Sequence, residues 1–152
     1  MPAFALKAAL PLLVPLAIEW AEAEAANAAK SGRPLSQAER DMAGTVGVRQ
    51  PHLIRIAMVD QMPRPSHPML KTAAMAAGFL GPGTAGLTLG HAVLVRHGQD
   101  SVRLLSHEFR HVFQYEQAGS IAAFLPVYLK QIVERGYEAA PFELDARRHE
   151  IG

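Results

Sequence analysis

Two histidines and a glutamate lie close together in the stretch SHEFRHVFQYE, which covers positions 106–116. Apolar residues recur around them at helical spacing, so we expect a helix with one face in a core. His107 and His111 are four residues apart and share the opposite face. Two imidazoles one turn apart can both reach one Zn²⁺ ion at about 2.0–2.1 Å. The spacing therefore favours a metal site over the alternative, a pair of solvent-facing histidines.

Glu108 directly follows the first histidine and lies one residue further round the helix. It cannot point with the two histidines, but it can still reach a water held on the metal. Zinc lowers the pKa of such a water toward about 7. We therefore expect Glu108 to act as the general base of a hydrolase.

A catalytic zinc site needs a third protein ligand and an open fourth position. The chain has no cysteine, so this ligand must be His, Asp or Glu. Position 117 is Gln117, which excludes the extended three-histidine form of the motif. Of the carboxylates downstream, we favour Glu143, early in a helix that Pro141 would begin. The alternative role for Glu143 is a first-turn glutamate that the helix dipole stabilises.

The segments HEFRH and PFELDA resemble the zincin metallopeptidases with a glutamate ligand, the gluzincins, and above all small bacterial zincins whose helix reads His-Glu-x-x-His-Val-x-Gln. The resemblance covers about residues 85–146, and the chain is shorter than thermolysin-like enzymes, with no second substrate lobe. It implies a peptidase with one zinc ion and an edge strand, within 87–95, that pairs with an extended peptide substrate. The matching residues are His107, Glu108, His111, Val112, Gln114, Pro141, Glu143 and Ala146.

Other residues are weaker candidates for the same site. By the same resemblance Tyr137 would stabilise an oxyanion, although a turn tyrosine that packs on the core is the simpler interpretation. Leu89 and His91, on the proposed edge strand, are expected to contact substrate. Asp145 could orient a ligand histidine or lie on the surface. An apolar preference beside the scissile bond is suggested by Leu87, Leu89, Val93, Phe109 and Phe124.

The remaining pattern predicts one α+β domain over residues 1–152, with a small antiparallel or mixed sheet whose edge strand lies over the active-site helix. Residues 87–98 are expected to form one strand, with Leu87, Leu89, Val93 and Val95 on one face. Ser36 and Glu39 have the spacing of a capping box. The expected helices cover about 4–30, ended by Gly32 and kinked at Pro11 or Pro15, then 36–48, 69–79, 101–118, 120–134 with a bend at Pro126, and 141–150, and a further strand covers 51–60.

Composition and charge limit the classes of binding partner that we expect. The net charge is +1 and the arginines are scattered, so the chain lacks the basic patch of a nucleic-acid-binding protein. Residues 8–18 are apolar but shorter than the roughly 20 residues of a membrane-spanning helix. We favour an N-terminal helix packed on the domain of a cytoplasmic protein. The alternatives are a signal peptide, and so an exported protein, or membrane contact through residues 1–18.

These features favour a zinc-dependent hydrolase, a peptidase with peptide or protein substrates. The alternative is a non-catalytic zinc-binding or membrane-associated interaction domain derived from a zincin. A purely structural zinc site has four protein ligands and no use for a base. No convincing fourth ligand is evident, and Glu108 is present, so the enzyme is the stronger hypothesis.

Overall fold

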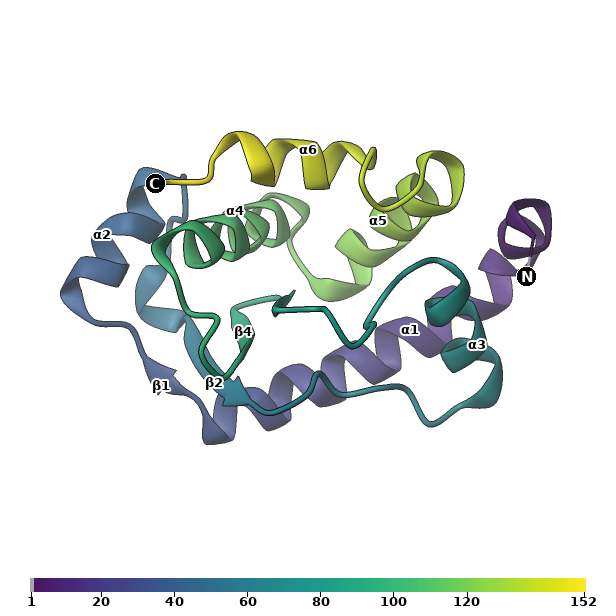
Figure 1. Ribbon diagram of the computed structural model, residues 1–152, viewed down its shortest axis with the longest axis horizontal. Helices are drawn as coiled ribbons and strands as arrows, with labels where there is room; N and C mark the ends of the chain where they lie inside the picture. The colour runs from purple at the N-terminus through teal and green to yellow at the C-terminus, as the bar shows by residue number, and fades with distance from the viewer. Residues whose placement is uncertain (1) are drawn as a thin grey trace.

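The computed structural model describes residues 2–152, which form an α+β domain with a small mixed sheet (Figure 1). This confirms the expected fold class. In chain order the elements are α1 (Ala3–Ser31), β1 (Arg33–Pro34), α2 (Gln37–Thr45), the 3-10 helix η1 (Pro51–Leu53), β2 (Arg55–Val59), α3 (Pro68–Ala76), β3 (Gly86–Leu89), β4 (Ala92–Arg96), α4 (Val102–Ala118), α5 (Ile121–Arg135) and α6 (Pro141–Arg148).

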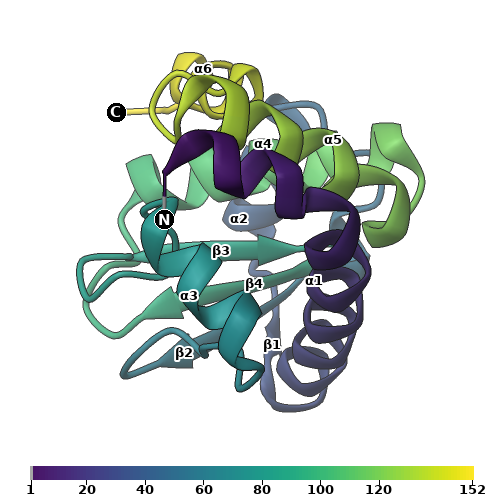
Figure 2. The same ribbon diagram turned by 90° about the vertical axis from the view of Figure 1, so that its right-hand side faces the viewer.

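The sheet has the strand order β1-β2-β4-β3, so β3 lies at an edge. The β2–β4 pair is parallel and the other two pairs are antiparallel. Alternate residues of the strands enter two different cores. One core packs against α1, α3 and α5, and the other packs against α2 and α4. The sheet therefore separates the α1 side of the molecule from the α4 side (Figure 2).

The prediction of one strand over 87–98 was wrong, because the chain reverses at Gly90 and His91. Gly90 has a φ of 67°, a conformation that glycine adopts without steric cost and that short hairpin turns require. Residues paired across an antiparallel hairpin point to the same face, so the reversal changes which side chains share a core. The four residues expected on one face divide into Leu87 and Leu89 on the α1 side and Val93 and Val95 on the α4 side.

The apolar N-terminal segment forms part of the core. Helix α1 continues through Pro11 and Pro15, which both lie on its exposed side. Its axis bends in the N-terminal half (Figure 2), as expected where proline removes helix hydrogen bonds. Helix α5 likewise continues through Pro126. The buried face of α1, which packs on the sheet, α3 and α5, comprises Leu6, Leu13, Ala17, Ala21 and Ala28.

The predicted capping box at the start of α2 is confirmed. The Ser36 hydroxyl accepts a hydrogen bond from the Glu39 backbone N–H at 3.2 Å, and the Glu39 carboxylate accepts one from the Ser36 N–H at 2.8 Å. Arg33 of β1 donates to both oxygens of Glu39 at 2.8 and 2.9 Å. One glutamate therefore joins the first strand to the second helix.

This contact predicts a pH-dependent contribution to stability. The hydrogen bonds from Arg33 lower the pKa of Glu39 to about 2, against the opposing effect of burial. The folded pKa is thus below the unfolded value of about 4.3, so the contribution is complete above that value and is lost as the pH falls toward 2. We expect Glu39→Gln to be less stable than the wild type at pH 7, with the difference shrinking below pH 4.

Urea unfolding at a series of pH values measures this difference. Asp41→Asn changes an exposed carboxylate on the same helix and serves as the control. A stability difference for Glu39→Gln that is the same at pH 2.5 and pH 7 would contradict the assignment.

Candidate metal centre

Helices α4 and α6 pack together and bring two histidines and one glutamate to one point. His107 and His111 come from α4 and Glu143 comes from the first turn of α6. One donor atom from each of the three lies within 4.8 Å of the other two. Glu143 is 1% exposed, although it is charged. The three residues that we chose from the sequence therefore form a group that could hold a metal ion.

The hydrogen bonds of the two imidazoles direct one nitrogen of each toward Glu143. His107 Nδ1 lies 2.8 Å from a carboxylate oxygen of Glu150, and His111 Nδ1 lies 2.8 Å from the side-chain oxygen of Gln114. Because these partners are acceptors, each Nδ1 carries a hydrogen. The Nε2 atoms lie 3.2 Å and 2.9 Å from the carboxylate of Glu143. Metal-binding histidines are held in this way, with Nδ1 bonded and Nε2 available.

Electrostatics at this point favour a positive charge. Burial disfavours the charged form of His111, but the hydrogen bond and negative charge of Glu143 outweigh it and raise the pKa of His111 to about 9. Burial disfavours a charged Glu143 too, yet the bonds from the two histidines keep its pKa well below the usual range. Protons on the two Nε2 atoms can supply this charge. A metal ion bound by the same three donors would replace them, since metals and protons compete for such ligands.

The chemistry of the three donors also fits a metal ion. Two imidazoles and one carboxylate suit zinc and other first-row divalent ions, and a set without thiolates is not specific for one of them. The structure thus supports a metal site without identifying the metal.

A chain of hydrogen bonds holds His111 in position. Gln114, whose oxygen bonds to His111, donates through its nitrogen to the Phe142 carbonyl and to the Asp145 carboxylate, both at 2.9 Å. The Asp145 carboxylate in turn accepts a hydrogen bond from Arg110 Nε at 2.8 Å. Asp145 therefore acts on the histidine indirectly, through Gln114, rather than by direct contact.

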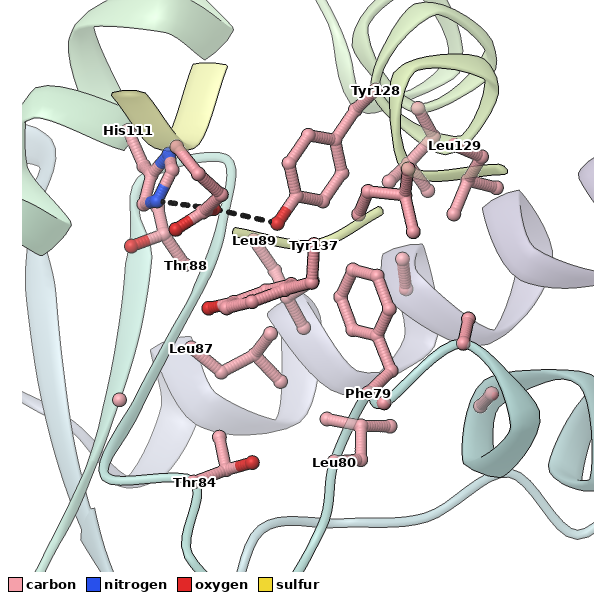
Figure 3. Close-up of a pocket in the computed structure, with 18 of the residues that line it drawn as sticks. Phe79, Leu80, Thr84, Leu87, Thr88, Leu89, His111, Tyr128, Leu129 and Tyr137 are labelled. Atoms are coloured by element: carbon pink, nitrogen blue, oxygen red, sulfur yellow. Dashed lines mark hydrogen bonds and ion pairs between the residues drawn. The ribbon is translucent and has the colours of Figure 1, made fainter. Parts of the chain in front are cut away.

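Two residues of the site were not predicted from the sequence. The Tyr128 hydroxyl of α5 donates to the Glu143 carboxylate at 2.7 Å (Figure 3). Glu150, after the end of α6, bonds to His107 and also accepts from Arg103 at 2.8 Å. Tyr128 lies on a helix with no motif, and Glu150 lies near the chain end, so no local spacing distinguishes either one from a core tyrosine or a surface glutamate.

Glu108 lies against the edge strand, next to the three donors. Glu108 is 5% exposed, and its Oε1 atom accepts a hydrogen bond from the Thr88 hydroxyl at 2.8 Å. The same hydroxyl contacts the Glu108 backbone carbonyl at 3.1 Å. A Cβ atom at Gly86 would lie 3.0 Å from the Glu108 carboxylate, so glycine makes this close approach to the strand feasible.

The three donors and Glu108 line one pocket of about 590 Å³. Tyr137 also lines this pocket and is 37% exposed. Its ring packs edge-on against that of Phe79, with 5.5 Å between the ring centroids (Figure 3). This position agrees with either role considered for the tyrosine. Leu89 reaches the pocket although it is 3% exposed. Of the other residues expected to create an apolar preference, Leu87 and Phe124 line the pocket, whereas Val93 and Phe109 are buried on the α4 side.

His91 is not brought to the site. It lies in the hairpin turn between β3 and β4, and its Nε2 atom pairs with Glu116 at 3.0 Å. Glu116 also accepts hydrogen bonds from the Arg49 and Gln50 backbone N–H groups at 2.8 and 3.0 Å. These residues line a second pocket, which contains none of the three donors. The expected substrate contact of His91 depended on a continuous strand, which the chain does not form.

Comparison of the chain with protein-family models, with curated proteins and with solved structures found no match.

The contact between His107 and Glu150 predicts an effect on metal affinity. Removing a carboxylate that orients a metal-binding histidine typically weakens metal binding about 10- to 100-fold. We expect a loss in this range for Glu150→Ala in a competitive titration of Zn²⁺ against a chelator. Glu138→Ala, which removes an exposed carboxylate of the turn before α6, is the control and should bind the ion as the wild type does. Equal affinities for all three proteins would rule out an orienting role for Glu150.

Proposed function

We propose that this protein is a zinc-dependent hydrolase, a peptidase, in which His107, His111 and Glu143 bind the ion and Glu108 is the general base. The observation that carries the proposal is the position of Glu108. Its buried carboxylate opens onto the same pocket as the three donor side chains, and Thr88 fixes one of its oxygens at 2.8 Å. A site used only for structure would have no need of a positioned base.

The donor set supports zinc as the ion. Two histidines and one glutamate are the protein ligands of one well-known class of catalytic zinc sites, which keep a further position open. Bound at this point, zinc would supply Lewis acidity, acidifying a water and polarising a substrate carbonyl. Among the described residues, no fourth His, Asp or Glu joins the group.

The chain's own residues can then be given roles. Glu108 accepts a proton from the attacking water and returns it to the leaving nitrogen. The Thr88 hydroxyl holds the carboxylate in one orientation, which favours proton transfer along a defined path. Tyr137, which lines the same pocket, can donate its phenolic hydrogen to the oxygen that becomes negatively charged. Tyr128 keeps the ligand carboxylate of Glu143 oriented.

The edge position of β3 supports an extended substrate beside the site. An edge strand presents main-chain groups that another chain can pair with. Thr88 of β3 already contacts Glu108, so a segment paired with β3 would pass close to the base. This arrangement agrees with the peptidase that the sequence resemblance implies.

The proposal predicts separate effects on metal binding and turnover. Glu108→Gln should retain zinc, because Glu108 is not among the three donors, but should lose about 10²- to 10⁴-fold in peptide hydrolysis. Zinc content by mass spectrometry and digestion of a peptide library measure the two effects. Glu134→Gln, an exposed change on α5, is the matched control. Full activity in Glu108→Gln would remove it as the base, and absence of zinc from the wild type would remove the metal site.

Gly86 provides a second test that leaves the four site residues unchanged. In Gly86→Ala the added methyl group would lie 3.0 Å from Glu108 Cδ, Cγ and Oε2, so the carboxylate must move. The shift needed is a few tenths of an ångström, and a displacement on the order of 1 Å can cost about 100-fold in rate. We therefore expect a smaller loss, roughly several-fold in kcat/KM, with normal zinc content. In Gly44→Ala of α2 the methyl group meets no atom within 4 Å, so this variant should behave as the wild type. Unchanged activity in Gly86→Ala would contradict the placement of Glu108.

A second function is favoured by the outer surface of α1. Phe4 and Leu12 are 77% and 65% exposed, and the helix span Phe4–Ser31 is long and apolar enough to cross a membrane, with 22% of its most apolar window buried. These features suit a membrane-associated interaction domain. Glu108 has no role in that function, which is why we rank it second.

Liposome co-sedimentation tests the membrane function. If α1 binds membranes, the wild type should pellet with phosphatidylcholine–phosphatidylglycerol vesicles, and Phe4→Ser/Leu12→Ser should stay in the supernatant. Both side chains are exposed, so the double change leaves the core intact. If both proteins remain in the supernatant, the membrane function is excluded.

A further inference from the structure

The pocket at the metal centre extends around the edge of the sheet into a second region. On the α4 side it contains the three donors and Glu108, and at β3 it passes from Thr88, which faces α4, to Leu87, which faces α1. Beyond β3 it continues between α1, α3 and α5. We call this part the apolar chamber, lined by Leu6, Leu10 and Leu13 of α1, Ala74 of α3 and its C-cap Ala77, and Leu129 of α5. Figure 3 shows Leu129, Phe79 and Leu80 beyond the two tyrosines.

The apolar chamber is much longer than one amino-acid side chain. Residues of α1 line the pocket from Leu6 to Ala21, which corresponds to roughly 20 Å along a helix at about 1.5 Å per residue. The whole pocket, about 590 Å³, falls within the usual range of small-molecule sites, about 300–1,000 Å³. The occupant must therefore be long and mainly apolar.

Hydrogen bonding decides between a peptide and an alkyl chain in this part of the pocket. The charged residues that line the pocket are all on α4, on α6 or at Glu150, close to the metal donors. The walls of the apolar chamber come mainly from helices, whose backbone groups are mostly bonded within the helix, and in smaller part from Phe79 and Leu80 of the segment between α3 and β3. A peptide backbone inserted there would lose its hydrogen bonds to water without replacement, which is costly. An alkyl chain has no such groups and gains from burial.

We propose that the apolar chamber binds a long, unbranched alkyl chain, and that the substrate is an amide whose acyl group carries this chain. The carbonyl would lie beside Glu108, and the chain would pass the edge of β3 into the chamber. In the reaction the water oxygen bonds to the carbonyl carbon, the C–N bond breaks, and the nitrogen leaves with a proton returned by Glu108. The products are a long-chain carboxylic acid and an amine. The bond cleaved rests on the proposed hydrolase function, whereas the binding of the chain does not.

Calorimetric titration with 1-hexanol, 1-octanol and 1-decanol tests chain binding without any need for metal or turnover. We expect affinity to rise about fourfold for each added methylene in the wild type and in Glu108→Gln. Ala74→Trp, which fills the chamber, should weaken 1-decanol binding at least tenfold. Ala76→Trp, an exposed change on the same helix that does not line the pocket, should have no effect. An affinity in the wild type that does not depend on chain length would overturn the proposal, whatever the variants do.

Hydrolysis of N-dodecanoyl and N-acetyl p-nitroanilides by the zinc-loaded protein tests the substrate class. We expect kcat/KM to be at least 100-fold higher for the dodecanoyl compound, and Ala74→Trp to remove most of this preference. Chain-length-dependent binding of alkanols with no hydrolysis of either compound would overturn the hydrolase but support the chain site. Equal kcat/KM for the two compounds would overturn the acyl substrate and leave the hydrolase standing.

Discussion

A buried carboxylate with two imidazoles directed at it is the constraint on which the site depends. Glu143 is 1% exposed, and an isolated charge in such a place would be strongly unfavourable. Its oxygens face His107 and His111 at 3.2 and 2.9 Å and the Tyr128 hydroxyl at 2.7 Å. This cluster joins α4, α5 and α6, because each helix contributes at least one of its members. Burial of Glu143 therefore favours a positive charge at the centre, which protons or a metal ion can supply.

The rest of the C-terminal half keeps these rings in one orientation. Gln114 lies one turn after His111, so a single helix supplies both the donor and the group that orients it. Asp145 and Arg110 then connect Gln114 to α6 and to the α2 side of the molecule, where Arg110 also donates to the Val46 carbonyl at 2.8 Å. Removing such outer contacts typically weakens metal binding about 10- to 100-fold. They also explain why α4 carries polar residues that are buried on one side and apolar residues on the other.

The small sheet separates two environments, and its edge connects them. Thr88 faces α4 and fixes Glu108, whereas Leu87 and Leu89 face α1 and form part of an apolar wall. Because β3 is at the edge, one pocket can pass from the charged side to the apolar side. The apolar N-terminal helix is what closes that second side. From the sequence, this helix could have been a core helix, a signal peptide or a membrane anchor. In the structure it packs against the pocket that contains the candidate metal centre.

The sequence determined those features that depend on neighbours a few residues apart. The spacing of His107 and His111, the capping box of Ser36 and the stop at Gly119 follow from helix geometry, and all three are present in the structure. Pro141 indicated the start of a helix, and Glu143 in its first turn lies with the two histidines in a group that could hold a metal ion. From the order of helices and apolar strands, the α+β class followed as well.

Tertiary structure decided everything that depends on contacts between distant segments. The pairing of Glu150 with His107 and of Tyr128 with Glu143 joins elements whose relative positions no periodicity specifies. The hairpin at Gly90 was missed because alternating apolar residues look the same in one long strand and in two short ones. Because of this hairpin, His91 lies away from the site and Leu87 lies on the face opposite Val93, contrary to the prediction. Local spacing fixes which face of a helix or strand a residue occupies, but only packing determines what that face meets.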